Sequence, residues 1–238
     1  PFYPEGGGQI GDTGEIFVSK KMSNSIFSFT VVDTKKENNL IIHTILDSGK
    51  NVEDYLGRYY YQLSINDINR KLTTRNHSAT HLLHYELRKL FGDHVEQKGS
   101  YVGPNYFRFD FSHFNKIEQK DLDIIESRVN HFIQQSIILK ESRDVPIEVA
   151  KKNGAISLFG EKYDNKVRVI EFGDSIEFCG GTHVSKTSEI GLFKIVSESS
   201  IASGIRRVEA VTSLNAFNFF NNKLHILNQI KVLLKSDD

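Results

Sequence analysis

Hydrophobic and polar positions in the first 66 residues alternate in short runs that predict strands. Four runs are rich in Val, Ile, Phe, Tyr and Thr. They are Glu15–Val18, Ser25–Val32, Leu40–Leu46 and Tyr59–Ile65, and clusters of Gly, Asn, Asp or Lys separate them. Short strands with no helical pattern between them favour a small antiparallel barrel or sandwich. We therefore expect residues 1–66 to form a small β-barrel.

A helical spacing of apolar residues replaces this pattern near Asn66–Asp67. Thr73 or Thr74 can cap the first helix. That helix should run through Asn76–Phe91 and end at Gly92.

The rest of the chain mixes strand and helix patterns. The expected elements are strands at Val95–Val102 and Tyr106–Phe111, a helix at Lys116–Ser136, an extended run at Ile137–Val145, a short helix from Pro146 to Gly154, strands at Val167–Phe172, Leu192–Ser199 and Ile205–Val211, and a helix at Leu214–Leu234. Helices that cross a largely antiparallel sheet make this an α+β fold. We expect an α+β domain in residues 67–212 and the start of a C-terminal helical segment in residues 213–238.

Composition narrows the class of protein. With 30 Lys+Arg and 30 Asp+Glu the formal net charge is zero, which excludes a strongly basic protein that coats nucleic acid but not a local basic patch. No apolar run approaches the roughly 20 residues that span a bilayer, so we expect no membrane partner. A single cysteine cannot form an internal disulfide, which indicates a reducing, intracellular compartment. The chain opens on Pro1 rather than Met and closes inside an amphipathic pattern, so we expect a piece of a larger protein.

Two helical histidines and a distant cysteine–histidine pair carry the candidate chemistry. His77 and His81 are four residues apart, which stacks both imidazoles on one helix face. Cys179 and His183 flank Gly180-Gly181-Thr182, and the glycine pair lets both side chains point at one centre. Three imidazoles and one thiolate suit zinc in ligand type and softness. The sequence therefore predicts a Zn²⁺ site at these four residues.

The role of such a site stays open at this point. Ser78 stands where the HExxH metalloprotease helix has its Glu, so a protease of that type is not expected. Four protein ligands close a tetrahedral site, which favours structural zinc, whereas catalytic sites keep a position for water. Thr80, three residues after His77, either lines a pocket beside the metal or bonds back to its own helix.

Several short motifs, taken in their order along the chain, resemble those of a known protein family. They are Pro1-Phe2-Tyr3, Gly7–Gly14 (GGQIGDTG), Arg75–Leu83 (RNHSATHLL), Val95–Ser100 (VEQKGS), Arg108–His113 (RFDFSH), Glu177–Val184 (EFCGGTHV) and Gly204–Thr212 (GIRRVEAVT). Together they resemble the editing region of alanyl-tRNA synthetases and its free-standing editing relatives, over residues 1 to about 212. Threonyl-tRNA synthetase editing domains share the two histidine-containing spacings, but the GGQxGDTG and CGGTH contexts resemble the alanine family.

The resemblance implies a fold and an activity. The fold is a small N-terminal β-barrel followed by an α+β zinc-containing editing domain and a C-terminal helix. The activity is hydrolysis of mischarged Ser-tRNA(Ala) and Gly-tRNA(Ala), with Zn²⁺ as cofactor and the acceptor end of tRNA(Ala) as partner. The family's zinc ligands would be His77, His81, Cys179 and His183.

The resemblance alone assigns roles to some further residues. Thr80 and Gln97 would lie near the seryl hydroxyl and, with Cys179, would be the catalytic residues. The segment Gly7-Gly8-Gln9 is tied to editing in the family and would contact substrate, although a tight turn between strands explains it equally well. The resemblance also implies a cytoplasmic chain joined to the aminoacylation and C-terminal domains of a synthetase, and a monomeric fragment.

Contact with tRNA needs cations beside the motifs despite the zero net charge. Seven residues can form such a basic rim, namely Lys98, Arg108, Lys151, Lys152, Lys162, Arg206 and Arg207. Two other functions remain open: a tRNA-docking module whose zinc is purely structural, and a complete free-standing deacylase that edits in trans.

Overall fold

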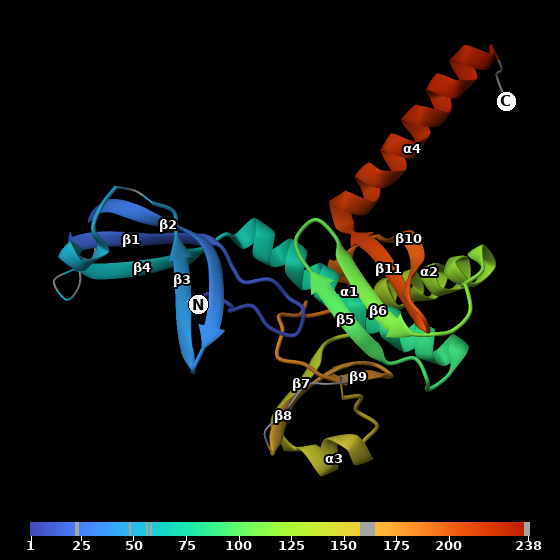
Figure 1. Ribbon diagram of the computed structural model, residues 1–238, viewed down its shortest axis with the longest axis horizontal. Helices are drawn as coiled ribbons and strands as arrows, with labels where there is room; N and C mark the ends of the chain where they lie inside the picture. The colour runs from blue at the N-terminus through green and yellow to red at the C-terminus, as the bar shows by residue number, and fades with distance from the viewer. Residues whose placement is uncertain (22–23, 48, 56, 58, 158–164, 236–238) are drawn as a thin grey trace.

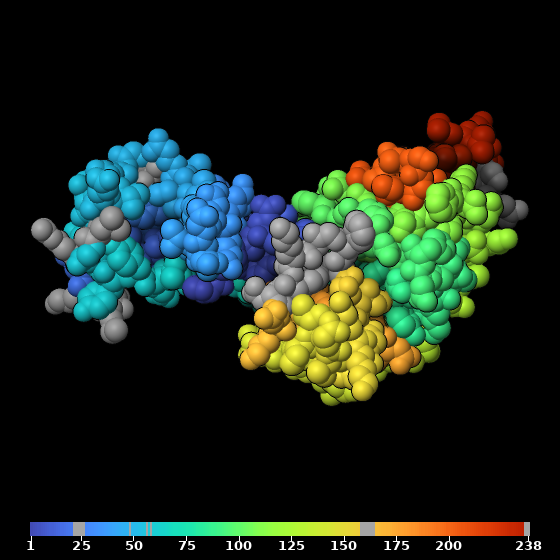
Figure 2. All heavy atoms as spheres, turned by 60° about the horizontal axis from the view of Figure 1, so that its bottom comes forward, coloured from blue at the N-terminus to red at the C-terminus, as the bar shows by residue number. Residues whose placement is uncertain are grey.

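The computed structural model describes residues 1–21, 24–47, 49–55, 57, 59–157 and 165–235. Within these residues it contains four α-helices and eleven strands in three antiparallel sheets. The N-terminal sheet forms a lobe of its own beside a larger lobe that holds the other two sheets and most of the helical residues (Figure 1). The space-filling view shows the blue-to-cyan N-terminal lobe standing apart from the larger lobe (Figure 2). The expected α+β class is confirmed.

The N-terminal sheet consists of four strands in the order β3-β2-β1-β4. The strands are β1 (Gly14–Lys21), β2 (Asn24–Glu37), β3 (Leu40–Ile45) and β4 (Tyr60–Ile65), and a single 3₁₀ turn, η1 (Val52–Tyr55), precedes β4. Strand β1 pairs with the first half of β2 up to Val31, whereas β3 pairs with the second half from Val31 onward.

This pairing corrects the expected barrel. The edge strands β3 and β4 do not pair among the described residues, so the sheet is open. Strand β2 also runs to Glu37, five residues past the predicted end at Val32, because Asp33–Lys36 pairs with β3 rather than forming a turn. The turn follows at Asn38 and Asn39, both with positive φ.

Helix α1 (Asp67–Phe91) crosses the larger lobe and carries the first two candidate ligands. It starts earlier than the predicted cap at Thr73 or Thr74, because the side chain of Asn66 accepts a hydrogen bond from the backbone N–H of Asn69 and caps the helix there. Gly92 ends it with φ of 106°, as predicted.

The main sheet has the order β10-β11-β6-β5 and lies against two helices. Its strands are β5 (Gln97–Val102), β6 (Phe107–Ser112), β10 (Phe193–Ala202) and β11 (Ile205–Thr212), and the helices are α1 and α2 (Gln119–Gln134). Phe107, Phe109 and Phe111 alternate along β6 onto the face that α1 covers, where they are fully buried with Leu82 and Leu83. This core fixes the position of α1.

A small third sheet lies beside α1 and leads into the second ligand pair. It has the order β7-β8-β9, with β7 (Lys140–Pro146), β8 (Lys166–Phe172) and β9 (Ser175–Phe178). Strand β9 was not among the predicted elements, because four residues between turns give too short a pattern. Pro146, predicted to begin a helix, instead ends β7 in an extended conformation, and α3 (Ile147–Lys152) follows it.

The last element among the described residues is α4 (Ser213–Leu234), which follows a single 3₁₀ turn, η2 (Thr187–Ile190), and strands β10 and β11. Figure 1 shows α4 projecting away from the body of the larger lobe. Most of its apolar side chains are exposed. No helix in the described part of the chain has the length and hydropathy needed to cross a bilayer.

Residues 1–13 form a loop that runs from the N-terminal sheet to the larger lobe and back (Figure 1). Its two arms meet where the backbone N–H of Asp12 donates to Tyr3 and the Asp12 carboxylate accepts from the N–H of Tyr3 at 2.6 Å. Arg70 of α1 donates to the same carboxylate, with Nε 2.9 Å from Oδ1. The base of the loop is thereby held against helix α1.

Candidate metal centre

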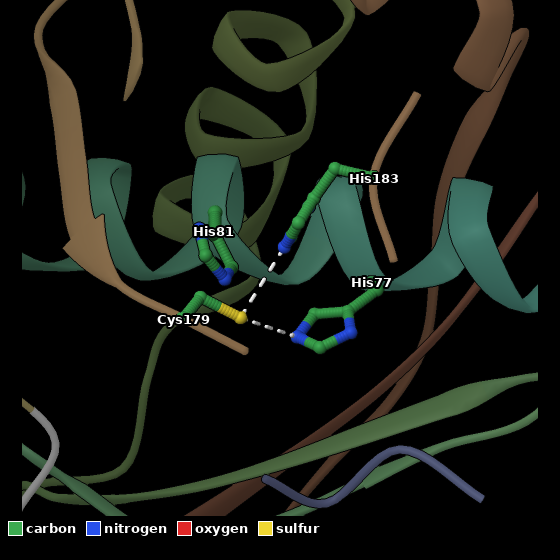
Figure 3. Close-up of side chains that lie close together, drawn as sticks. All are labelled: His77, His81, Cys179 and His183. Atoms are coloured by element: carbon green, nitrogen blue, oxygen red, sulfur yellow. Dashed lines mark hydrogen bonds between the residues drawn. The ribbon is translucent and has the colours of Figure 1, made fainter. Parts of the chain in front are cut away.

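Helix α1 and the loop after β9 bring four side chains to one point. His77 and His81 come from the same face of α1, and Cys179 and His183 come from the loop (Figure 3). The thiol Sγ of Cys179 lies 3.3 Å from Nε2 of His77 and 3.2 Å from Nε2 of His183. One ligand atom from each of the four lies within 4.8 Å of the others.

The loop is shaped so that it can approach α1 closely. The backbone N–H of Cys179 donates to the carbonyl of Arg168 at 3.0 Å, which extends the β8–β9 pairing to the first ligand. A Cβ atom at Gly181 would overlap the ring of His77, so only glycine lets the loop lie against that ring. The Gly181 N–H also points at Cys179 Sγ, at 3.3 Å.

Partners outside the cluster contact the Nδ1 atoms of His183 and His81. The Ser78 hydroxyl donates to the Thr74 carbonyl at 3.1 Å, so its oxygen is left to accept from His183 Nδ1, also at 3.1 Å. A carboxylate oxygen of Glu177 lies 3.6 Å from His81 Nδ1, and the other oxygen lies 2.9 Å from His84 Nδ1. Both contacts leave Nε2 of the ligand directed inward, as is typical of metal-binding histidines.

Gln9 reaches the cluster from the tip of the N-terminal loop. Its Oε1 lies 2.7 Å from His77 Nδ1 and 2.9 Å from the backbone nitrogen of Thr182. Gly6 and Gln9 exchange backbone hydrogen bonds of 3.1 and 3.0 Å around Gly7 and Gly8, whose φ angles are 57° and 79°. Positive φ at both central residues makes this a tight hairpin turn that requires glycine.

Burial sets the charge of the imidazoles. It holds the pKa of His77 and of His183 well below the ordinary 6.5, with the neighbouring imidazoles and Arg168 adding to the effect. Burial also lowers the pKa of His81, although Glu177 opposes it. For Glu177 itself, burial acts to raise the pKa, but the charges of His81 and His84 outweigh it and the pKa is lowered. Neutral imidazoles backed by an ionised carboxylate are the metal-binding form.

The donor set and its spacing fit zinc. From Zn–S and Zn–N bond lengths of about 2.3 and 2.0–2.1 Å, the ligand atoms of a tetrahedral site lie about 3.4 to 3.6 Å apart. The two Sγ–Nε2 distances, 3.3 and 3.2 Å, are close to that spacing. His77, His81 and Cys179 are all buried, so little water competes for these positions.

Thr80 and Gln97 occupy different places relative to this cluster. Thr80 is buried on α1, and its hydroxyl donates to the carbonyl of Asn76 at 2.9 Å, the local bond that its helical position allowed. Gln97 is half-buried at the first position of β5, in register with Phe111. It therefore lies at the opposite end of β5 from Val102, which pairs with Gln9.

The expected basic rim is largely paired with acids within the protein. Arg207 donates to Asp110 from Nε and Nη2, at 2.7 and 2.9 Å. Arg206 is almost fully buried and forms an ion pair with Glu198. Lys98 bonds to Glu96 at 2.9 Å and Arg108 lies 3.8 Å from Asp110. Lys151 and Lys152 are exposed at the end of α3, and Lys162 lies outside the described residues.

Arg168 is a structural partner that sequence reasoning missed. It donates from one Nη1 to the carbonyls of Cys179 and Gly181, at 3.0 and 2.6 Å. Its Nε and Nη2 bind the two carboxylate oxygens of Glu141 on β7, each at 3.0 Å. The guanidinium of Arg168 thereby connects the loop that carries Cys179 and His183 to β7. Nothing in the spacing of Glu141 and Arg168 signals this pairing, whereas Glu177 could have been flagged by its place two residues before Cys179.

Comparison with known proteins decides the family. Residues 167–209, which contain Cys179 and His183, match the family described as the threonyl and alanyl tRNA synthetase second additional domain. The chain is 47% identical over 238 residues to the alanine--tRNA ligase of Flavobacterium psychrophilum and 49% identical over 238 residues to that of Christiangramia forsetii, covering 99% and 100% of the chain. The chain is homologous to the alanyl-tRNA synthetase region that carries this domain.

The homology covers one region of much longer proteins. The alanine--tRNA ligase of Bacteroides fragilis is 47% identical over 236 residues, which are 99% of the chain. In all three cases the chain spans 26% of the length of the relative. The candidate metal centre therefore lies within an alanyl-tRNA synthetase region that accounts for about a quarter of those relatives.

The Arg168–Glu141 pair predicts a pH-dependent stability of this synthetase region. The hydrogen bond from Arg168 lowers the pKa of Glu141 from 4.5 to about 2; partial burial opposes this shift and Arg143 adds to it. A depressed carboxylate pKa stabilises the fold above the unfolded value and loses that contribution as pH falls towards the folded value. We expect Glu141→Gln to lower the free energy of unfolding near pH 6, and the difference from the wild type to shrink as pH falls below 4.5.

Urea unfolding at several pH values between 6 and about 3 measures this difference. Glu148→Gln, a change at an exposed carboxylate of α3, is the matched control and should show little difference at any pH. A Glu141→Gln difference that stays constant with pH would show that the ion pair does not hold the loop.

Proposed function

We propose that the chain is the editing part of an alanine--tRNA ligase and hydrolyses mischarged Ser-tRNA(Ala) and Gly-tRNA(Ala). The observation that carries the proposal is the cluster of His77, His81, Cys179 and His183 in a chain homologous to alanyl-tRNA synthetases over its whole length. The family description of residues 167–209 as an additional domain shared with threonyl-tRNA synthetases supports it.

Physical chemistry explains the need for a second site. An alanine pocket cannot exclude glycine by size, and it rejects serine, which adds one hydroxyl, by only about 10²-fold. A separate site that hydrogen-bonds the extra hydroxyl discriminates better, because the correct alanyl ester would leave its polar groups unpaired. Glycine, which has no hydroxyl, enters such a site by its small size.

The centre would act on the labile ester that joins the amino acid to the terminal ribose. His77, His81, Cys179 and His183 would hold Zn²⁺, which when bound supplies Lewis-acid polarisation of a carbonyl or a water. These residues, fixed by their outer partners, position the ester. The Glu177 carboxylate lies behind His81 and His84, so it orients imidazoles rather than reaching the ester.

Thr80 and Gln97 are the proposed contacts for the seryl hydroxyl. Thr80 lies one turn along α1 from His77, and its oxygen can accept a hydrogen bond while it donates to Asn76. Gln97 lies on the sheet face that α1 covers, since it is in register with the buried Phe111. Gly7 and Gly8 would take part indirectly, through the turn that carries Gln9.

The partners are part of the same proposal. The acceptor end of tRNA(Ala) would approach the centre, with Arg207, Lys151 and Lys152 contributing cations and Arg206 supporting the sheet. The remainder of the synthetase, a cytoplasmic location and a monomeric state of this piece belong to the proposal as well.

A second function is a tRNA-docking module with purely structural zinc. The number of protein ligands favours it, because four side chains fill a tetrahedral site and leave no position for water. In the editing proposal, zinc that is bound by all four ligands at once serves mainly to position groups and water is activated elsewhere, whereas zinc with an open position polarises the carbonyl or a water.

Deacylation assays separate the two functions. We expect the chain to release serine from Ser-tRNA(Ala) and to leave Ala-tRNA(Ala) intact, and we expect activity to fall at least 100-fold on removal of zinc with a chelator and to return when zinc is added. Cys179→Ala should lose the activity in the same way because it removes one ligand. Binding of tRNA without turnover by the zinc-loaded chain would favour the docking module. Undiminished hydrolysis by a folded Cys179→Ala variant would contradict the assignment of the centre.

Thr80→Val tests the contact with the seryl hydroxyl. Valine keeps the shape of threonine and removes the hydroxyl, so hydrolysis of Ser-tRNA(Ala) should slow by about 2- to 10-fold, the worth of one neutral hydrogen bond. Hydrolysis of Gly-tRNA(Ala) should change little, since glycine has no hydroxyl. Thr44→Val, at an exposed position on β3, is the matched control. Equal slowing of both substrates would show that Thr80 does not read the hydroxyl.

A further inference from the structure

The N-terminal loop contributes a fully buried side chain to a centre whose other residues lie at least 68 positions away in the sequence. The loop tip pairs with β5: the backbone N–H of Val102 donates to the Gly8 carbonyl at 2.7 Å and that of Ile10 donates to the Val102 carbonyl at 3.1 Å. This pairing directs Gln9 into the larger lobe, where it is 0% exposed and where its Oε1 faces His77, 68 residues along the chain.

The contacts of Gln9 fix which atom of its amide faces the histidine. The backbone N–H of Thr182 can only donate, so the amide atom 2.9 Å from it must be the oxygen Oε1. The same oxygen lies 2.7 Å from Nδ1 of His77. An amide oxygen can only accept, and therefore Nδ1 of His77 must carry a proton.

That proton determines the role of the other ring nitrogen. A neutral imidazole with its proton on Nδ1 has its lone pair on Nε2, and Nε2 of His77 faces Cys179 Sγ at 3.3 Å. The Gln9 amide nitrogen Nε2 is buried and has no hydrogen-bond partner within the part of the chain that the structure describes. The buried position of Gln9 therefore gives hydrogen-bond partners to its Oε1 and not to its Nε2.

We propose that Gln9 is a positioning residue that holds His77 in the Nδ1-protonated tautomer, aims its Nε2 at the centre and thereby sets zinc affinity. The inference rests on the proposed function only in that the centre binds zinc. It gives the glycine turn a physical purpose: a side chain at Gly8 would meet Ser100 at 2.7 Å and displace the loop that carries Gln9. It also makes the zinc site depend on residues of the N-terminal loop.

Zinc affinity, measured by competition with a chromophoric chelator, tests the proposal in three variants. Gln9→Met keeps the length of the side chain but removes the acceptor, and it should weaken zinc binding 10- to 100-fold, the usual effect of removing a partner of a ligating histidine. Gln9→Glu keeps an acceptor oxygen and should restore most of the affinity. Gly8→Ala should weaken binding in the same direction without touching the amide.

A second readout does not depend on zinc. Long-range ¹H–¹⁵N correlations of the histidine rings in the zinc-free chain should show His77 protonated at Nδ1 in the wild type and a mixture of tautomers in Gln9→Met. Gln62→Met, an exposed change on β4, is the control and should leave both readouts unchanged. A folded Gln9→Met variant with wild-type zinc affinity would overturn the proposal, as would a wild-type His77 protonated at Nε2.

The same measurements distinguish failure of the proposed function from failure of the inference about Gln9. A wild-type chain that binds no zinc overturns the metal centre and the link from Gln9 to zinc affinity, while the ring correlations still decide whether Gln9 fixes the tautomer. A chain that binds zinc with the expected dependence on Gln9 but hydrolyses no mischarged tRNA overturns the editing activity alone.

Discussion

Three imidazoles, two of them buried and that of His183 partly exposed, must each present the same ring nitrogen to one point, and most of the surrounding structure serves that requirement. A buried polar ring without partners costs free energy, and a ring free to flip or change tautomer would not present a fixed lone pair. Gln9 hydrogen-bonds His77 and Ser78 hydrogen-bonds His183, whereas the Glu177 carboxylate lies 3.6 Å from Nδ1 of His81, too far for a hydrogen bond. These partners come from three parts of the chain, so the centre exists only when the loop, α1 and the β9 loop are all in place.

Elements of both lobes surround the cluster, and separate contacts hold each of them in place. The phenylalanines of β6 fix helix α1, and the guanidinium of Arg168 holds the loop after β9. The N-terminal loop is held by Asp12, which binds both Tyr3 and Arg70. Gly7 and Gly8 turn the backbone with positive φ, and a side chain at Gly8 or Gly181 would overlap Ser100 or the ring of His77. The glycine-rich motifs are therefore part of the construction of the centre.

Sequence reasoning correctly predicted the features that depend on the spacing of residues close together in the chain. The four-residue interval between His77 and His81 placed both on one helix face, and alternation along β6 and β11 predicted those strands within one or two residues. It failed where long-range pairing decides. The expected barrel is an open sheet, since β3 and β4 do not pair in the described part of the chain, and the charged run Asp33–Lys36 gave no sign of continuing as a strand.

Tertiary contacts also hid the outer partners of the ligands. Arg168 and Glu141 pair across β7 and β8, and Gln9, although it lies in a motif already singled out, reaches His77 across 68 residues, so neither spacing nor composition reveals these two contacts. Glu177 and Ser78 lay inside motifs already singled out, but their carboxylate and hydroxyl gained a meaning only from the ring positions. The clustering of the four candidate ligands was thus predictable from the sequence, and the contacts that support them were not.

The central claim is that three imidazole Nε2 atoms and the thiolate of Cys179 bind one zinc ion together. X-ray absorption at the zinc edge of the zinc-loaded chain tests it most directly. We expect one sulfur at about 2.3 Å and three imidazole nitrogens at about 2.0–2.1 Å, with the sulfur lost in Cys179→Ser. A shell of nitrogen and oxygen alone, or a spectrum that Cys179→Ser leaves unchanged, would contradict it.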